Sequence, residues 1–152
     1  MQIRILFLCS FFCASTLTLL AQPANDECAN ALELTNVVDF CSSPATYTNA
    51  QATQSAEETP GCFPDDPNNP HNDVWFRFTA VATDVNIRVI GATRLNTGGT
   101  IRNPQVAIYS GSCSELTLLQ CISDNMNNNV AQTFENGLNI GDTYYIRVSA
   151  RN

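Results

Sequence analysis

Apolar and polar residues alternate along several short segments of the chain with the period of β-strands. Every second residue is apolar over residues 74–80, and the same pattern recurs over residues 85–89. Four more segments, each bounded by Gly, Asn, Asp or Pro, carry strand-like patterns: 105–109, 116–122, 130–134 and 143–149. Such alternation predicts strands with one buried face. Short strands at this spacing predict an all-β chain folded as an antiparallel sandwich.

The segments between these strands are mostly irregular. One short helical turn is predicted near the start, where Asn25 or Asp26 is a suitable N-cap and the turn would carry residues 28–34. Two loops, residues 57–73 and 123–129, are rich in Asn, Asp and other turn-forming residues. Because both are short and flanked by predicted strands, we expect ordered surface loops rather than disordered segments.

The N-terminus carries an almost continuous apolar run. Arg4 precedes this run, which extends over residues 5–20 and is interrupted by four hydroxyl side chains. The pattern predicts a signal peptide over residues 1–21 with cleavage after Ala21. A transmembrane anchor is the alternative, but the run is shorter and more polar than the roughly 20 apolar residues that span a bilayer. We therefore expect an exported protein in which residues 22–152 form a single domain.

The predicted mature chain is strongly acidic. Loss of Arg4 leaves six Arg against fourteen Asp and Glu, with no Lys, which is a net charge of −8. This charge repels phosphate polyanions, so neither nucleic acid nor an anionic membrane is an expected partner. Cations and neutral polymers remain compatible with it. The alternative interpretation is that the acidity simply keeps an exported protein soluble.

Four blocks of sequence occur in an order that is similar to a known module. They read N-D-E-C at 25–28, D-V-W-F-R-F at 73–78, V-A-I-Y-S-G-S-C at 106–113 and G-D-T-Y-Y-I-R-V at 141–148. The blocks resemble the bacterial pre-peptidase C-terminal-like (PPC-like) domain of secreted and surface proteins of gliding Gram-negative bacteria. The resemblance implies a jelly-roll-like β-sandwich appended to secreted peptidases, glycan-degrading enzymes and adhesins, with no catalytic residues of its own.

Five cysteines belong to the predicted mature chain, and in an exported protein they predict disulfides. Their spacing lacks the close pairs typical of zinc ligands. Cys113 and Cys121 flank one short predicted strand, so we expect them to pair, and Cys28 is expected to pair with Cys41. This assignment leaves Cys62 unpaired.

Domains of the PPC-like family usually continue after the last block into one more strand, often with a cysteine. The present sequence ends at Asn152. Together with the odd cysteine count, this predicts a domain that lacks its last strand and belongs to a longer parent protein. The alternative is a complete small protein in which Cys62 is a buried thiol.

No catalytic residues are predicted. The single histidine, His71, lies in a proline-rich loop, and the chain has no hydrolase-triad or zinc-protease motif. Asp65, Asp66, Asp73 and Asp84 offer carboxylates of the kind used in glycoside hydrolysis, but such residues occur on every acidic surface. We therefore expect a non-catalytic domain.

Calcium is the one cofactor that the loop composition suggests, because carboxylate and amide oxygens are the ligands it takes. Two groups of residues are candidates. The first contains Asp65, Asp66, Asn68, Asn69 and Asp73, and the second contains Asp124, Asn125, Asn127 and Asp142. The alternative is that these turn-forming residues make local hydrogen bonds to the backbone.

Two functions remain open for an extracellular or cell-surface protein, or a periplasmic one if a sorting domain is lacking. The first is a module that binds or adheres to extracellular polysaccharide or protein. The second is a structural spacer, or a propeptide-like accessory domain of a secreted peptidase, without a ligand. Exposed, coplanar aromatic rings would favour the first and complete burial the second, and the rings to consider are Trp75, Tyr47, Tyr109, Tyr144 and Tyr145.

Overall fold

The computed structural model describes residues 21–63, 70–93, 99–124 and 126–150. These residues contain a short 3₁₀ helix and seven strands: η1 (Cys28–Asn30), β1 (Leu32–Glu33), β2 (Val74–Thr79), β3 (Asp84–Ile90), β4 (Pro104–Ser112), β5 (Glu115–Ser123), β6 (Val130–Asn136) and β7 (Thr143–Ala150). All six strands predicted from the alternation are present. The predicted helical turn is shorter than expected, because its second half is extended and forms β1.

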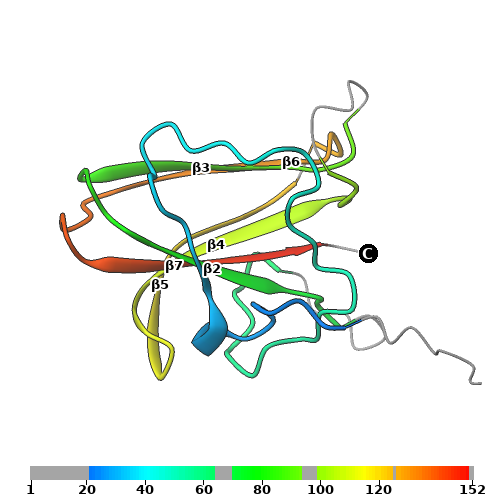
Figure 1. The fold of residues 1–152 in the computed structure, drawn as a ribbon, viewed down its shortest axis with the longest axis horizontal. Helices are drawn as coiled ribbons and strands as arrows, with labels where there is room; N and C mark the ends of the chain where they lie inside the picture. Colours follow the sequence, from blue (N-terminus) through cyan, green and yellow to red (C-terminus); the bar gives the residue numbers. More distant parts are fainter. Residues whose placement is uncertain (1–20, 64–69, 94–98, 125, 151–152) are drawn as a thin grey trace, which may run out of the picture.

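The strands form two sheets, with the order β1-β2-β7-β4-β5 in one and β3-β6 in the other. Strand β1 runs parallel to β2, and every other pairing is antiparallel. Figure 1 shows β3 and β6 lying together as one layer and β2, β7, β4 and β5 as the second. The chain passes from one sheet to the other at β2–β3, β3–β4, β5–β6 and β6–β7, as in jelly rolls. The predicted jelly-roll-like antiparallel sandwich is confirmed.

The main core lies between the two sheets. Phe76 of β2 and Ile146 of β7 belong to a buried cluster against which Val85, Ile87 and Val89 of β3 pack. Side chains on a strand point alternately to opposite faces, which is why the apolar residues at every second position of β2, β3 and β7 reach this core.

The opposite face of the five-stranded sheet is buried as well. Trp75, Ala107 and Tyr109 form a second cluster there with Cys28 of η1 and with Phe63, which lies in the irregular segment before β2. The five-stranded sheet is therefore covered by β3 and β6 on one face and by irregular chain on the other. This second covering forms the candidate site described below.

Two disulfides join the irregular segments to the sheet. Cys28 pairs with Cys113 and Cys62 pairs with Cys121, with Cα atoms 5.6 and 5.8 Å apart, while Cys41 is free and exposed. The predicted pairs, Cys113 with Cys121 and Cys28 with Cys41, are wrong. Cys113 lies in the turn before β5 and Cys121 lies near the far end of that strand, so the extended backbone holds them roughly 20 Å apart.

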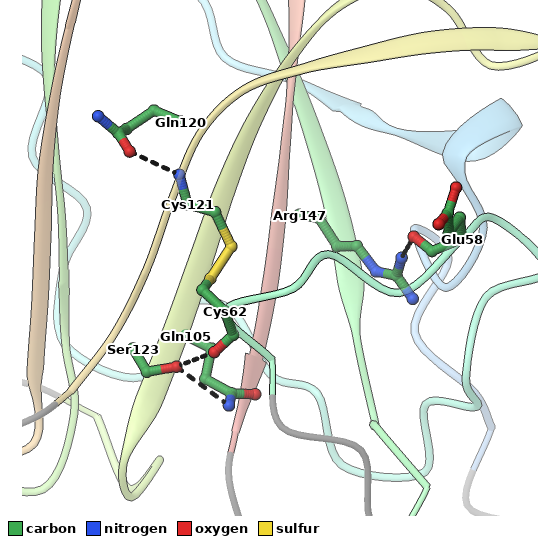
Figure 2. Close-up of a disulfide and its surroundings, with 7 residues drawn as sticks. All are labelled: Glu58, Cys62, Gln105, Gln120, Cys121, Ser123 and Arg147. Atoms are coloured by element: carbon green, nitrogen blue, oxygen red, sulfur yellow. Dashed lines mark hydrogen bonds between the residues drawn. A yellow bond between two sulfur atoms is a disulfide. The ribbon is translucent and has the colours of Figure 1, made fainter.

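Cys62 is bonded rather than unpaired, as Figure 2 shows. Its carbonyl also accepts a hydrogen bond from the Ser123 hydroxyl at the end of β5, and Ser123 is joined in turn to Gln105 of β4. The cysteine without a disulfide partner in the described residues is therefore Cys41 rather than Cys62.

The predicted signal peptide falls outside the described residues except for Ala21. Within the described ranges, no helix is both long enough and apolar enough to cross a membrane.

We predict that replacing Cys28 and Cys113 by Ser lowers the free energy of unfolding by about 4 kcal/mol, because their bond closes a long loop in the unfolded chain. The two residues are 85 positions apart. Urea denaturation followed by Trp75 fluorescence measures the loss, and the control Cys41→Ser, at an exposed free thiol, should change stability by less than about 0.5 kcal/mol. Recovery of a peptide in which Cys28 is linked to Cys41 would contradict the pairing.

Candidate functional site

A buried ion pair lies on the covered face of the five-stranded sheet. The Arg147 Nε–H of β7 donates to Asp73 Oδ2, one residue before β2, and both side chains are 0% exposed. Removing either charge from water is costly unless the partner and further hydrogen bonds compensate for it. The structure supplies these additional partners from the irregular chain.

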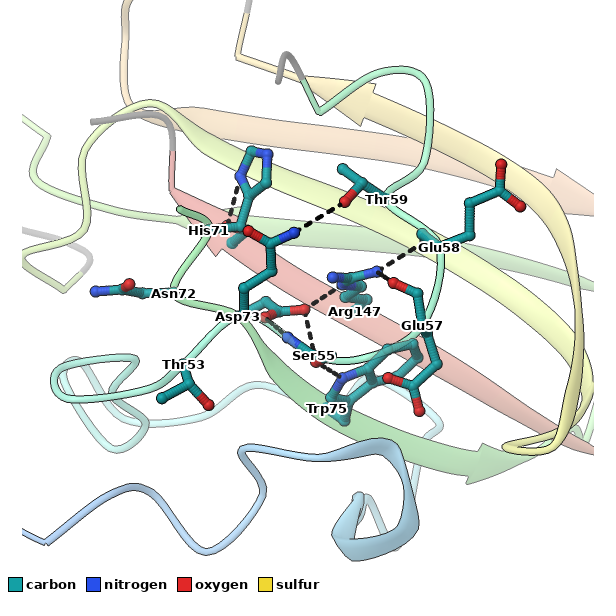
Figure 3. A network of polar contacts seen from close by, with 12 residues as sticks. Thr53, Ser55, Glu57, Glu58, Thr59, His71, Asn72, Asp73, Trp75 and Arg147 are labelled. Atoms are coloured by element: carbon teal, nitrogen blue, oxygen red, sulfur yellow. Dashed lines mark hydrogen bonds and ion pairs between the residues drawn. The ribbon is translucent and has the colours of Figure 1, made fainter. Parts of the chain in front are cut away.

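Ser55 satisfies the remaining acceptor positions of Asp73. Its backbone N–H donates to Asp73 Oδ1 over 2.9 Å and its hydroxyl donates to Oδ2 over 2.8 Å. The Trp75 indole N–H donates to the Ser55 hydroxyl in turn. Figure 3 shows Ser55 between Asp73 and the Trp75 ring, with Arg147 on the other side of the carboxylate.

Arg147 holds the next residues of the same loop. Its Nη1 donates to the backbone carbonyls of Glu57 and Glu58 over 3.3 and 3.0 Å. The guanidinium carbon lies 5.3 Å from the centre of the Trp75 ring and 5.9 Å from that of Phe63, within the range of cation–π attraction. The loop backbone at 57–58 is thus fixed relative to β7.

A pocket of about 550 Å³ opens between this loop and the β4–β5 hairpin. It is lined by residues 56–61 together with Tyr109, Cys113, Ser114, Leu116 and Leu118. We call it the hairpin pocket. Its volume is in the range of small-molecule sites, and it combines apolar walls with a few polar groups, as such sites do.

One buried oxygen of the lining, Glu57 Oε2, has no hydrogen-bond partner within the described residues. The Tyr109 side chain is only 5% exposed, and its hydroxyl shares a hydrogen bond with the Arg147 side chain. The polar side chains of the lining that a bound molecule can reach are the more exposed ones, Glu58, Thr59 and Ser114.

The charges around the pocket are coupled. Burial raises the pKa of the Tyr109 hydroxyl, while the nearby Arg147 charge and a side-chain hydrogen bond with Arg147 act in the opposite direction. Burial is also the main cause that raises the pKa of the Glu27 carboxyl, and the negative charges of Glu57, Asp26 and Asp73 add to it. Negative charge therefore prevails on the Glu27 and Glu57 side of the site.

Most of the first predicted calcium group lies outside the described residues, namely Asp65, Asp66, Asn68 and Asn69. The same holds for Asn125 of the second group. Over the described ranges, no three His, Cys, Asp or Glu side chains are grouped so that they would hold a metal ion.

The remaining calcium candidates have other partners. Asp73 is in the ion pair, and Asp124 accepts the backbone N–H groups of Met126 and Asn129 within its own loop, where Asn127 is exposed. Asp124 lies beside Pro104, which pairs with the last residue of β7. Asp142 immediately precedes the first residue of β7, so the two aspartates lie at opposite ends of this strand. The predicted convergence of Asp124 and Asp142 is wrong, because β7 separates them.

The aromatic rings do not form a stacking platform. Trp75, Tyr109 and Tyr144 are buried, Tyr145 is half-buried, and the exposed Tyr47 turns its edge to Phe76. By the criterion set from the sequence, this burial counts against sugar stacking on a flat aromatic face.

His71 is also buried. Its ring lies against Phe63 at a centroid distance of 5.5 Å, and Nδ1 is 3.5 Å from the Ser149 hydroxyl, which is itself fully buried. Both groups are placed in the interior rather than on the hairpin pocket.

The sequence singled out Asp73 only as a calcium or catalytic candidate and did not single out Arg147. The two residues had a usable signal, since each is a charge next to or within a strongly apolar strand, and two such opposite charges are expected to pair. Glu57 had none, because it is one acidic residue among several in an irregular loop. Tyr109 was considered for stacking rather than for its hydroxyl.

The sequence profile of a family described as galactose binding domain-like, and associated with the type IX secretion system, matches residues 24–152. The match supports a β-sandwich related to the one inferred from the four sequence blocks, but it does not confirm the PPC-like assignment. Comparisons with curated proteins and with solved structures gave no match. The match and the two disulfides together indicate an exported protein.

We predict that Asp73→Asn lowers the free energy of unfolding by about 3 kcal/mol, because it leaves the Arg147 charge buried without its counter-ion. Arg147→Met should have an effect of similar size. The double variant should lose less than the sum of the two, since it leaves no charge unpaired. Urea denaturation of the four proteins measures this coupling, and strictly additive losses would show that the pair is not what stabilises the loop.

We also predict that Glu27→Gln stabilises the domain near pH 7 and does so less near pH 4. The pKa of Glu27 is raised above its ordinary value of 4.5, so the native chain loses stability as pH rises through that pKa. Glutamine does not ionise and avoids this loss. Thermal melts of both proteins across this pH range measure the difference, which should grow with pH; a constant or shrinking difference would rule the explanation out.

Proposed function

This chain belongs to the galactose binding domain-like family associated with type IX secretion, and we propose that it binds carbohydrate in the hairpin pocket. It acts as a non-catalytic accessory module of an exported protein. The observation that carries the proposal is the hairpin pocket itself, which is large enough for a small molecule and combines apolar walls with the polar side chains of Glu58, Thr59 and Ser114.

A sugar fits the chemistry of this lining. Its hydroxyl groups both donate and accept, which suits the polar side chains of Glu58, Thr59 and Ser114 in the lining. Its C–H groups pack on apolar side chains, which Leu116 and Leu118 supply on the β5 wall and Pro60 on the loop wall. The recognition is therefore by hydrogen bonds in a pocket rather than by stacking on an aromatic platform.

The location of the module follows from export. Two disulfides suit an oxidising compartment outside the cytoplasm. On a cell-surface or secreted protein, a domain that binds polysaccharide holds the rest of that protein at its target, which is an adhesive role.

A second candidate function is a spacer without a ligand. The burial of Trp75, Tyr109 and Tyr144 favours it, because none of these rings is available to a partner. A spacer would bind no glycan and would tolerate a blocked pocket without any functional consequence.

We predict that the mature chain binds soluble glycans and that Gly61→Phe abolishes this binding. Gly61 lines the pocket, and a Cβ placed there meets no atom within 4 Å, so a large ring can be added beside the pocket without disturbing the backbone. Tyr109→Phe should weaken binding about threefold to tenfold, because it removes the hydroxyl that bonds Arg147, and Arg147 fixes the loop wall of the pocket. Screening on a glycan array, followed by titration calorimetry, measures both effects.

The matched control is Gln132→Phe, which adds the same ring on an exposed position of β6 in the other sheet. It should bind as the native chain does. Binding that survives Gly61→Phe places the site elsewhere, and a native chain that binds no glycan supports the spacer.

A further inference from the structure

Strand β5 forms one margin of the five-stranded sheet and presents an open row of backbone groups there. It pairs with β4 along one side. Among the described residues, no other segment shares a backbone hydrogen bond with residues 115–118. An unpaired edge of this kind is a template for an added strand. The opposite margin of the sheet is β1, which is two residues long and offers far less edge.

The open part of the edge is the first half of β5. A bulge beside Ile108 interrupts the ladder, so that Leu119 lies opposite no residue of β4. Beyond the bulge, the backbone N–H of Cys121 donates to the side-chain oxygen of Gln120 over 3.0 Å, so the strand itself occupies this donor. Residues 115–118 have no such cover, which leaves roughly 13 Å of edge for pairing.

This half of the strand lacks the devices that usually protect an edge. Natural edge strands carry lysine, proline or inward-pointing charges that prevent pairing. Residues 115–118 read E-L-T-L, and their one charge, Glu115, stands at the exposed start of the strand. The Leu118 side chain is 43% exposed. An apolar side chain is thus accessible beside the unpaired backbone.

The charge around this edge distinguishes between possible occupants. Glu115 is exposed, and the exposed Glu58 lines the same pocket as Leu116 and Leu118. Neither β5 nor the loop at 56–61 contains a basic residue. A second copy of this chain, with a net charge of −7, would bring further carboxylates against these, which is unfavourable. A basic segment would instead be attracted.

The two faces of the strand define the pattern that an added strand should have. Side chains alternate between the faces, so Leu116 and Leu118 point to one face and Glu115 and Thr117 to the other. An added strand has its own side chains beside the same two faces. Apolar residues at every second position would therefore contact the leucines, and basic residues between them would lie on the side of Glu115.

We propose that the edge of β5 at residues 115–118 binds an extended segment of a protein partner in which basic and apolar residues alternate. The backbone of this segment pairs with the free N–H and C=O groups and continues the sheet by one strand. Backbone pairing supplies the affinity, and the contacts at Leu118 and Glu115 supply the selectivity. The inference goes beyond the proposed carbohydrate function and does not depend on it.

The experiment titrates the mature chain with a short synthetic peptide in which lysine alternates with valine. Two further versions carry N-methyl groups on every second backbone nitrogen, each on a different alternate set. One set faces β5 in an added strand and the other faces away from it. One methylated peptide should therefore bind about tenfold or more weakly than the parent, and the other about as tightly as the parent. A peptide with glutamate in place of lysine should bind about tenfold or more weakly as well.

A variant of the protein tests the location. Leu118→Lys places a charge on the edge, as natural edge strands do, and should weaken binding of the lysine peptide about tenfold or more. The matched control, Gln132→Lys, adds the same charge at an exposed position of β6 in the other sheet and should bind nearly as the native chain does. Urea denaturation of both variants verifies that the fold is retained.

Several outcomes would overturn the proposal. The lysine peptide might fail to bind, or the two methylated peptides could bind equally, in which case attraction between charges alone explains the affinity. Equal binding of the glutamate peptide would remove the selectivity for basic segments. A dimer of the mature chain in sedimentation velocity that Leu118→Lys dissociates would assign the edge to a second copy. None of these results bears on glycan binding, so this inference and the proposed function fail separately.

Discussion

The buried ion pair between Asp73 and Arg147 is the contact on which the covered face of the sheet depends. A guanidinium at the centre of a strand with no access to water is tolerated only if its charge and its donors are matched. Asp73 matches the charge, and the backbone carbonyls of Glu57 and Glu58 match two donor contacts. The hydrogen bonds that satisfy the buried arginine therefore also fix one wall of the hairpin pocket. The stability of the covered face and the shape of the proposed binding site depend on the same contacts.

The strands were predictable because the alternation that defines them is local. Phe76 and Phe78 are two residues apart in β2, so they point to the same face of the sheet and reach the core between the sheets. The same holds for Ile146 and Val148 in β7. The burial of both faces of the five-stranded sheet was harder to predict from the sequence. Strand β4 is buried on both faces over most of its length, and a nearly continuous apolar run of this kind is the sequence signal that was available for it.

The disulfides and the pocket were not predictable from spacing. Cys62 and Cys121 are 59 residues apart in the sequence. They meet because an irregular loop crosses the sheet at β5, and the path of such a loop leaves no periodic pattern in the sequence. Glu57 and Tyr109 meet at the pocket for the same reason. A short sequence separation misled the pairing of Cys113 with Cys121, because an extended strand carries neighbours in sequence far apart in space.

The two disulfides overlap along the chain, since the second begins inside the segment closed by the first and ends beyond it. A peptide bond broken anywhere between Cys28 and Cys121 consequently leaves both pieces joined by at least one bridge. Exported proteins meet proteases, and exposed loops are where proteases cut. A single nick between Cys28 and Cys121 would thus leave the two fragments covalently joined across the sheet.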